Sequence, residues 1–168
     1  MVGGQMLDLI AETTRLDIGA ITRLQRMKTG ELIAFSCESG AILGKASPPQ
    51  RHALRAYAHD LGLAFQIIDD LLDYVGDERT LGKHPGTDFR NGRLTLPALL
   101  LAEAMVIPAH ADFAWTRDAI VTSDIAAQCH ARGRRHVEQA LAALSVLPAG
   151  EARVVLERIA WAILDRRA

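Results

Sequence analysis

The sequence predicts an all-α fold, of the helical-bundle type, on the basis of three observations. Alanine and leucine dominate while aromatic residues make up only 5% of the chain, and this composition favours helices over strands. No segment alternates apolar and polar side chains at period two for the length of a strand. Apolar residues instead recur at intervals of three and four, as on one face of a helix.

Four regions carry this helical pattern, and start or stop signals bound several of them. In chain order they are Leu16 to about Gly44, with a break near Gly30; Pro49 to Val75, after the start signal Ser47-Pro48-Pro49; Leu96 to Met105, with Pro97 in its first turn; and Asp112 to Arg167, which we expect to hold two or three helices with Pro148-Ala149-Gly150 between the last two.

The length and charge of the chain bound its function. With 168 residues, of which 49% are hydrophobic, the chain can form one globular domain over residues 1–168. Its 19 Lys and Arg residues nearly balance its 20 Asp and Glu residues, for a net charge of -1. Because no global positive field results, we expect no binding to nucleic acid.

The cysteines and the apolar segments indicate the compartment. Cys37 and Cys129 lie far apart and form no CxxC pair, which fits a reducing environment. The first residues lack a basic region followed by an apolar core, so we expect no signal peptide. The longest apolar stretch, Leu94 to Ile107, contains polar residues and is too short to span a bilayer. We therefore predict a cytoplasmic protein with no transmembrane segment.

The most informative segment is the acidic part of the second predicted helix, Leu61 to Tyr74. Gln66, Asp69 and Asp73 recur at three and four residues beside an apolar stripe, and Asp70 flanks them. Like charges four residues apart repel on a helix, so this pattern is unfavourable unless solvent or a cation compensates. A solvated polar face is one interpretation. The apolar surroundings favour the other, a Mg²⁺ site, because Mg²⁺ takes one or two carboxylates together with water and phosphate oxygens.

A long polar segment, Gly76 to Thr95, follows this helix. A loop of this length inside a compact helical domain is more often functional than not. It contains Lys83, and its glycines allow the backbone to approach a ligand closely. Carboxylates for a cation beside a lysine for an anion are the components of a metal-bridged diphosphate site, although Lys83 alone equally fits an ordinary exposed loop residue.

The order of these motifs resembles that of the trans-isoprenyl (polyprenyl) diphosphate synthases, such as those that make farnesyl or geranylgeranyl diphosphate. Their second aspartate-rich motif and following loop are similar to Phe65-Gln66-x-x-Asp69-Asp70-x-x-Asp73, Gly82-Lys83, Gly86, Asp88, Gly92-Arg93, Thr95 and Pro97. Two upstream motifs agree in order and separation, Gly4-Gln5-x-x-Asp8-Leu9 and Lys28-Thr29-Gly30. The resemblance covers nearly the whole chain and implies an isoprenoid synthase-type helical bundle.

The resemblance also implies site residues. Three acids would hold Mg²⁺ bridged to an allylic prenyl diphosphate: Asp69, Asp70 and Asp73. Three cations would contact the diphosphate oxygens: Lys28, Lys83 and Arg93, the last standing where the family usually has lysine. Two polar side chains would lie beside the allylic carbon and stabilise the carbocation: Thr29 and Gln66. Two more would line the same cavity: Gln5 and Asp8. Metal and lysines together would stabilise the departing diphosphate.

Part of the family pattern is missing. Family members are much longer and carry a first DDxxD motif followed by arginines that hold isopentenyl diphosphate, and neither feature occurs upstream of Asp69. The apolar helical pattern also begins at Met6, without a capping residue before it. We therefore expect a partial bundle without the amino-terminal helices. Three downstream arginines are interpreted as a solvated helix face: Arg132, Arg134 and Arg135.

Three functions remain open on this basis. The first is a half-enzyme for head-to-tail condensation of isopentenyl diphosphate with an allylic prenyl diphosphate, with the missing half supplied by a longer chain or a partner in a homo- or hetero-oligomer. The second is a non-catalytic binding or regulatory subunit of a full-length synthase, which the absent first motif favours. The third is a terpene cyclase, but no Asn/Asp-Ser/Thr-Glu triad is found in a suitable place.

Overall fold

The structure, a computed structural model, describes residues 2–11, 17–77 and 84–166, with side chains from residue 2 to residue 7 in the first range. Its elements are α1 (Val2–Ala11), α2 (Ile18–Gln25), a π-helical turn (Arg26–Gly30), α3 (Glu31–Leu43), α4 (Pro48–Val75), α6 (Thr87–Arg90), α7 (Leu96–Ala104), α8 (Phe113–Thr122), α9 (Ile125–Ala143), a 3₁₀ turn (Leu144–Val146) and α10 (Glu151–Leu164). These ranges contain no strand, so the predicted all-α fold is confirmed.

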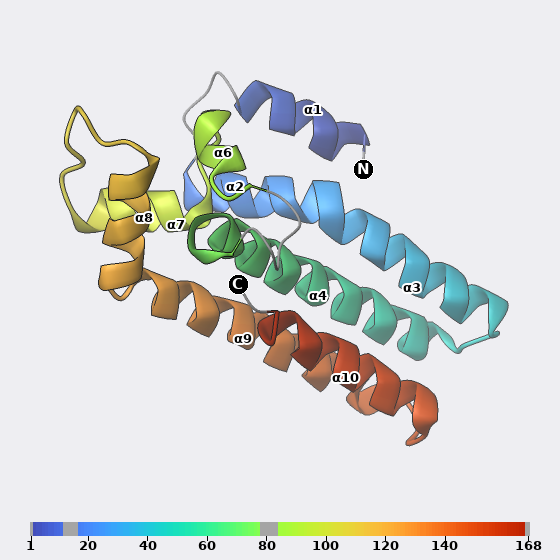
Figure 1. Ribbon diagram of the computed structural model, residues 1–168. Helices are drawn as coiled ribbons and strands as arrows, with labels where there is room; N and C mark the ends of the chain where they lie inside the picture. Colours follow the sequence, from blue (N-terminus) through green and yellow to red (C-terminus); the bar gives the residue numbers. More distant parts are fainter. Residues whose placement is uncertain (1, 12–16, 78–83, 167–168) are drawn as a thin grey trace.

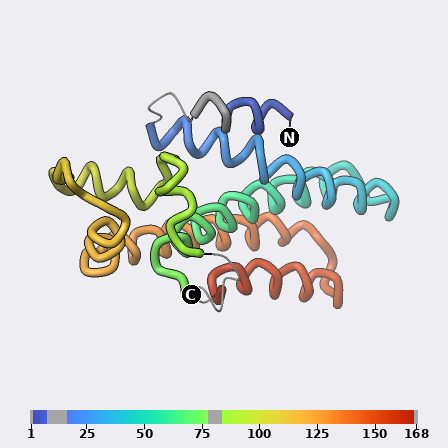
Figure 2. Tube along the Cα trace, turned by 45° about the horizontal axis from the view of Figure 1, so that its top comes forward, coloured from blue at the N-terminus to red at the C-terminus, as the bar shows by residue number. Residues whose placement is uncertain are grey.

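The long helix α4 is the centre of the bundle. Figure 1 shows it between α3 on one side and α9 and α10 on the other, and it packs against all three. At one end of the bundle α7 and α8 pack against α4 and α9, while α1 lies across α2 and the π-helical turn, as the second view also shows (Figures 1 and 2). The helices α3, α7, α8, α9 and α10 are therefore positioned directly by α4, and α1 is positioned by α2 and the π-helical turn.

The start of α4 follows from its sequence. Pro48 and Pro49 occupy the first turn, where a missing backbone N–H is tolerated. The Gln50 side chain accepts a hydrogen bond of 2.8 Å from the Ser47 backbone N–H, which satisfies a donor just before the helix. The helix begins one residue earlier than the sequence predicts and ends, as predicted, at Val75.

Two apolar clusters hold the bundle together, and α4 contributes to both. One joins α4 to α3, α9 and α10 through buried residues that include Tyr57, Leu61, Ile68, Val137 and Ile163. The other joins the carboxy-terminal half of α4 to α7, α8 and α9 through residues that include Ile67, Leu71, Tyr74, Leu101, Ile120 and Cys129. Because the acidic residues lie in this second half of α4, they sit within a tightly packed part of the molecule.

The sequence predicts a break near Gly30 in the first long helix, and this prediction is wrong. The helix continues there through the π-helical turn. Gly30 there lies directly against Gly62 of α4, where an added Cβ would be 2.8 Å from the Gly30 Cα atom. Single π-helical turns inside α-helices often mark functional sites. This turn carries Lys28 and Thr29 and presents them beside α4.

The later elements agree with the sequence in number and place. The third predicted helix is α7, and the fourth region contains α8, α9 and α10, with α10 beginning directly after Gly150. The polar segment after α4 differs from the prediction in one respect, since it contains the short helix α6.

Replacing Gly62 by alanine should destabilise the fold, because the new methyl group would meet the backbone of Gly30. We expect a loss of about 1–3 kcal/mol in the free energy of unfolding, the usual range for overpacking. Gly40 on α3 is the matched control, since an added Cβ there meets no atom within 4 Å. Gly40→Ala should stabilise the helix by up to about 1 kcal/mol. Urea unfolding measures both, and equal effects would contradict this account of the helix contact.

Candidate functional site

Asp70 is the buried carboxylate of the acidic segment on α4. Only 7% of the residue is exposed. The Gln25 side chain on α2 donates a hydrogen bond of 2.8 Å from Nε2 to Asp70 Oδ2, and the backbone N–H of Leu96 donates to the same carboxyl group. Asp70 therefore connects α4 to α2 and to the start of α7.

Asp73 is fully buried and holds the loop that follows α4. Its Oδ2 atom accepts a hydrogen bond of 2.9 Å from the Asp88 backbone N–H, and its Oδ1 atom accepts one of 3.3 Å from that of Thr87. Its backbone carbonyl accepts a further bond of 2.7 Å from Gly86. The carboxylate thus lies at the amino-terminal end of α6 and fixes the position of this turn.

Asp69 is the most accessible of the three predicted metal ligands, with 30% of its side chain exposed. Its Oδ1 atom lies 3.3 Å from the Arg166 guanidinium, which reaches α4 from beyond the end of α10. The same guanidinium lies over the Phe65 ring, 4.6 Å from its centroid. Arg166 therefore places a positive charge beside Asp69.

Burial raises the pKa of Asp70 well above its usual value, and the charges of Asp88, Asp69 and Asp73 raise it further, against the hydrogen bond from Leu96. Ionising these carboxyl groups together is therefore unfavourable unless a cation compensates their charge. Carboxylate oxygens are the kind of ligand that Mg²⁺ takes in proteins. Among the described residues no three His, Cys, Asp or Glu side chains gather as a ligand set, and the predicted magnesium site stays a prediction.

The structure brings together the two residues predicted to face the reacting carbon. The Thr29 hydroxyl donates a hydrogen bond to Oε1 of Gln66, and both side chains are partly buried. Lys28 precedes Thr29 in the π-helical turn and is half-buried. Gly4 of α1 lies against the Lys28 backbone so closely that a Cβ atom there would clash. The two upstream motifs therefore meet at Lys28.

The remaining predicted residues are placed less completely. Gln5 is exposed on α1, and Arg93 lies 3.7 Å from Asp88 Oδ1. Asp8 lies on α1, but its side chain is outside the described part of the structure, and Lys83 lies outside the described residues altogether. We expect Lys28 and Lys83 to line the cavity that binds the diphosphate, and this cavity stays a prediction.

Two residues that contact the acids were not predicted. Gln25 precedes Thr29 by four residues on a helical segment, a spacing that could have identified it as facing the same way. Arg166 follows Asp69 by 97 residues, and no local pattern connects the two.

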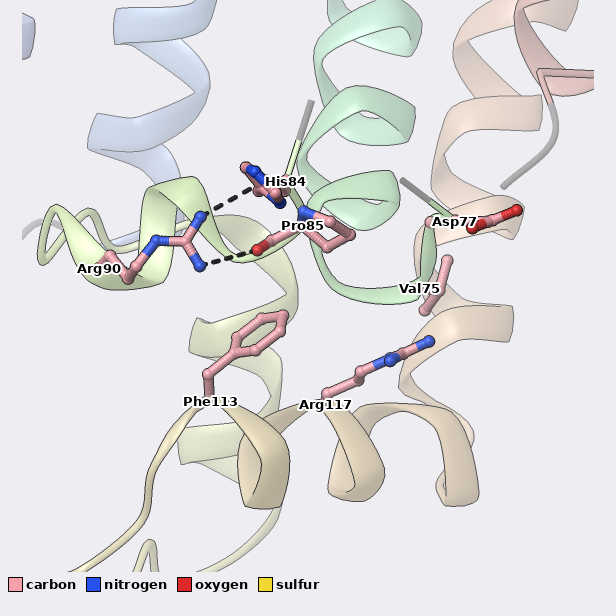
Figure 3. A pocket seen from close by; sticks show the side chains of 8 residues that line it. Val75, Asp77, His84, Pro85, Arg90, Phe113 and Arg117 are labelled. Atoms are coloured by element: carbon pink, nitrogen blue, oxygen red, sulfur yellow. Dashed lines mark hydrogen bonds between the residues drawn. The ribbon is translucent and has the colours of Figure 1, made fainter. Parts of the chain in front are cut away.

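A large cavity, of about 860 Å³, lies beyond the carboxy-terminal end of α4. Its lining residues come from α4, the following loop, α6 and α8. Gly76 is one of them, and Figure 3 labels the others: Val75, Asp77, His84, Pro85, Arg90, Phe113 and Arg117. Arg90 donates hydrogen bonds to the backbone carbonyls of Pro85, at 2.9 Å, and His84, at 3.4 Å, and so stabilises the loop. Gly86 adopts a φ of 80°, and a Cβ there would meet the Phe113 ring at 2.6 Å.

Similarity to known proteins identifies the family of the chain. The family model described as polyprenyl synthetase matches residues 1–111. The chain belongs to the polyprenyl synthetase family. A heptaprenyl diphosphate synthase component 2 from Geobacillus stearothermophilus is 36% identical over 172 aligned residues, which cover 95% of this chain and 54% of that protein. The farnesyl diphosphate synthase of Escherichia coli is 48% identical over 103 residues, 60% of this chain and 34% of that protein.

Solved polyprenyl synthases share the fold. A polyprenyl synthase from Caulobacter crescentus, crystallised with calcium and isoprenyl diphosphate, matches with a TM-score of 0.91 and 34% identity over 99% of this chain and 56% of that one. A heptaprenyl diphosphate synthase from Staphylococcus aureus matches with a TM-score of 0.89 and 27% identity over 99% of this chain and 57% of that one. The chain thus spans a little more than half of the length of these two structures.

The length and the apolar character of the helices decide whether one of them could span a membrane. In the described part of the chain, none combines the length and the apolar character needed to cross a bilayer.

Replacing Asp70 by asparagine should stabilise the fold at neutral pH in the absence of divalent cations. Asparagine leaves a single oxygen for the Gln25 and Leu96 donors, but it removes a charge whose ionisation burial disfavours, and at neutral pH we expect the second effect to be larger. Because the folded-state pKa lies above that of the unfolded chain, the stability of the wild type should fall as pH rises from about 4 through the folded-state pKa. The difference in the free energy of unfolding between Asp70→Asn and the wild type should therefore grow with pH. Urea unfolding in the presence of EDTA measures it.

The exposed acid Asp118 on α8 supplies the control, and Asp118→Asn should follow the wild-type pH dependence. An Asp70→Asn protein with that same dependence would show that Asp70 ionises as easily in the folded state as in the unfolded chain.

Proposed function

We propose that this chain supplies the part of a prenyltransferase of isoprenoid biosynthesis that binds an allylic prenyl diphosphate through Mg²⁺. The observation that carries the proposal is the acidic end of α4, where Asp70 and Asp73 are fixed by hydrogen bonds and Asp69 stays accessible. Membership of the polyprenyl synthetase family supports it. So does the relative from C. crescentus, which was crystallised with calcium and isoprenyl diphosphate.

The three acids have different parts in this proposal. Asp69 would be the ligand most open to a metal-bound diphosphate, whereas Asp70 and Asp73 would orient the helix end and the loop and add negative charge beside it. Bound Mg²⁺ would neutralise charge on the diphosphate oxygens and so make diphosphate a better leaving group. Lys28, Lys83 and Arg93 would bind the remaining oxygens from the π-helical turn and the loop.

Thr29 and Gln66 would act on the hydrocarbon side of the same bond. Gln66 precedes Asp69 by three residues on α4, so the two side chains lie one helical turn apart. When the bond between carbon and oxygen breaks, positive charge develops on the allylic carbon. The side-chain oxygens of this hydrogen-bonded pair would stabilise that charge, because they are fixed before the reaction begins.

The condensation also requires isopentenyl diphosphate. We propose that residues outside this chain, in a longer chain or in a partner of a homo- or hetero-oligomer, complete that site, while Gln5 and Asp8 on α1 line the shared cavity. The share of the relatives that the chain covers, 54% and 34% in two of them, supports this division. Two further points remain predictions: that residues 1–168 form one domain, and that the protein is cytoplasmic.

A second candidate function is that of a non-catalytic binding or regulatory subunit of a full-length synthase. It is favoured by the relative named component 2 of a heptaprenyl diphosphate synthase, which aligns with 95% of this chain. The two candidates differ in one measurable property. A prenyltransferase part must bind a prenyl diphosphate in a Mg²⁺-dependent manner through its own acids, and a purely regulatory subunit need not.

Isothermal titration of geranyl diphosphate tests the proposal. With Mg²⁺ present, Asp69→Asn should weaken binding by at least about tenfold, the equivalent of 1.4 kcal/mol, because an accessible ligand of the bridging cation is lost. Asp118→Asn, which removes the same charge from an exposed position on α8, should leave the affinity unchanged. Equal affinity of the wild type and Asp69→Asn, or binding that persists in EDTA, would reject the proposal and leave the regulatory subunit as the better account.

A further inference from the structure

A second cavity, of about 280 Å³, lies on another face of α4, where α2, α7 and α9 meet it. Its lining residues are Ile18, Ile21, Thr22, Gln25, Leu63, Ile67, Leu96, Arg132, Arg135 and His136. It contains none of the acids of the proposed magnesium site. One of its lining residues, Gln25, donates to Asp70, so the cavity and the acidic end of α4 are separated by a single side chain.

The cavity carries positive charge on one wall. Arg132 and Arg135 are three residues apart and so lie one turn apart on α9. Within the described part of the chain, neither guanidinium forms a hydrogen bond or an ion pair, and no carboxylate is among the residues that line the cavity. His136 is engaged differently, since its Nδ1 atom lies 2.9 Å from Asp60 Oδ1.

The structure separates these two arginines from Arg134, although all three were interpreted as one solvated face. The Arg134 guanidinium lies over Trp161 of α10, 5.7 Å from the ring centroid, and so packs on the opposite side of α9. Arg132 is half-buried at the cavity wall. A long cationic side chain that lies at a cavity without a counter-charge is suited to bind an anion there.

The other wall of the cavity is aliphatic. It is formed by side chains from α2, α4 and α7: Ile18, Ile21, Leu63, Ile67 and Leu96. The Thr22 hydroxyl donates to the Ile18 carbonyl at 2.8 Å, so its proton is engaged by the backbone. Apolar side chains with a few convergent polar groups are the usual composition of a small-molecule site.

We propose that this cavity binds a small phosphate monoester with a short aliphatic body. The two guanidinium groups bind the phosphate oxygens, since a planar guanidinium matches phosphate geometry in a bidentate manner. The aliphatic wall binds the alkyl group and excludes water from it. The site needs no metal, and the inference does not depend on the proposed prenyltransferase function.

Titration of n-butyl phosphate into the full chain in EDTA tests this inference, followed by calorimetry and by backbone amide chemical shifts. We expect tighter binding of butyl phosphate than of inorganic phosphate, with the largest shifts at residues 18–25 and 132–136. Arg135→Gln alters an exposed side chain, so it should fold normally, and it should weaken binding by about tenfold, as expected for one lost charge-assisted contact. The double variant Arg132→Gln/Arg135→Gln should lose binding altogether.

Arg134→Gln is the matched control, because it removes the same charge from the opposite side of α9, which faces α10, and it should leave the affinity unchanged. Lys28→Gln alters the proposed diphosphate site and should also have no effect. Butyl phosphate affinity that is unchanged in Arg135→Gln, or reduced equally by Arg134→Gln, would overturn the inference. Loss of affinity in Lys28→Gln would overturn it as well, since the phosphate would then occupy the other site.

Discussion

The burial of two carboxylates at the carboxy-terminal end of α4 is the constraint on which the rest of the site depends. Asp70 and Asp73 are nearly or fully inaccessible to solvent, and a buried carboxylate is unfavourable unless hydrogen bonds satisfy it. Gln25 of α2 and the start of α7 supply those of Asp70, and the first two residues of α6 supply those of Asp73. Three separate segments are therefore held at one helix end. Asp69, on the same turn, remains accessible between them.

Close contact between helices positions the other half of the site. Gly62 allows α4 to lie directly against Gly30, the last residue of the π-helical turn, and Gly4 allows α1 to lie against the backbone of Lys28. As a result, Thr29 meets Gln66 across the helix contact. A larger residue at Gly62 or Gly4 would meet backbone atoms and separate the elements that carry Lys28, Thr29 and Gln66. Packing thus explains Gly4 of the first upstream motif and Gly62 of α4.

Much of this could be predicted from the sequence, since the helical periodicity, the Ser-Pro-Pro start of α4 and the order of the motifs are local patterns. The resemblance implied that Thr29 and Gln66 lie beside one reacting carbon; the structure shows the two side chains hydrogen-bonded to each other, and their role stays a prediction. The contact of Arg166 with Asp69 and the separate environments of Arg132 and Arg134 could not be predicted, because they depend on where α9 and α10 pack. The continuous helix at Gly30 was also missed, since glycine usually ends a helix but here serves a close contact.

The central claim is that a divalent cation binds at the acidic end of α4, and paramagnetic broadening by Mn²⁺ tests it most directly. Mn²⁺ takes the same oxygen ligands as Mg²⁺ and broadens the amide signals of nearby residues in nuclear magnetic resonance spectra. The account predicts that substoichiometric Mn²⁺, with geranyl diphosphate present, broadens the signals of residues 69–73 and 86–88 first and that excess Mg²⁺ reverses the effect. Broadening centred elsewhere, or unchanged in Asp69→Asn, would contradict the claim.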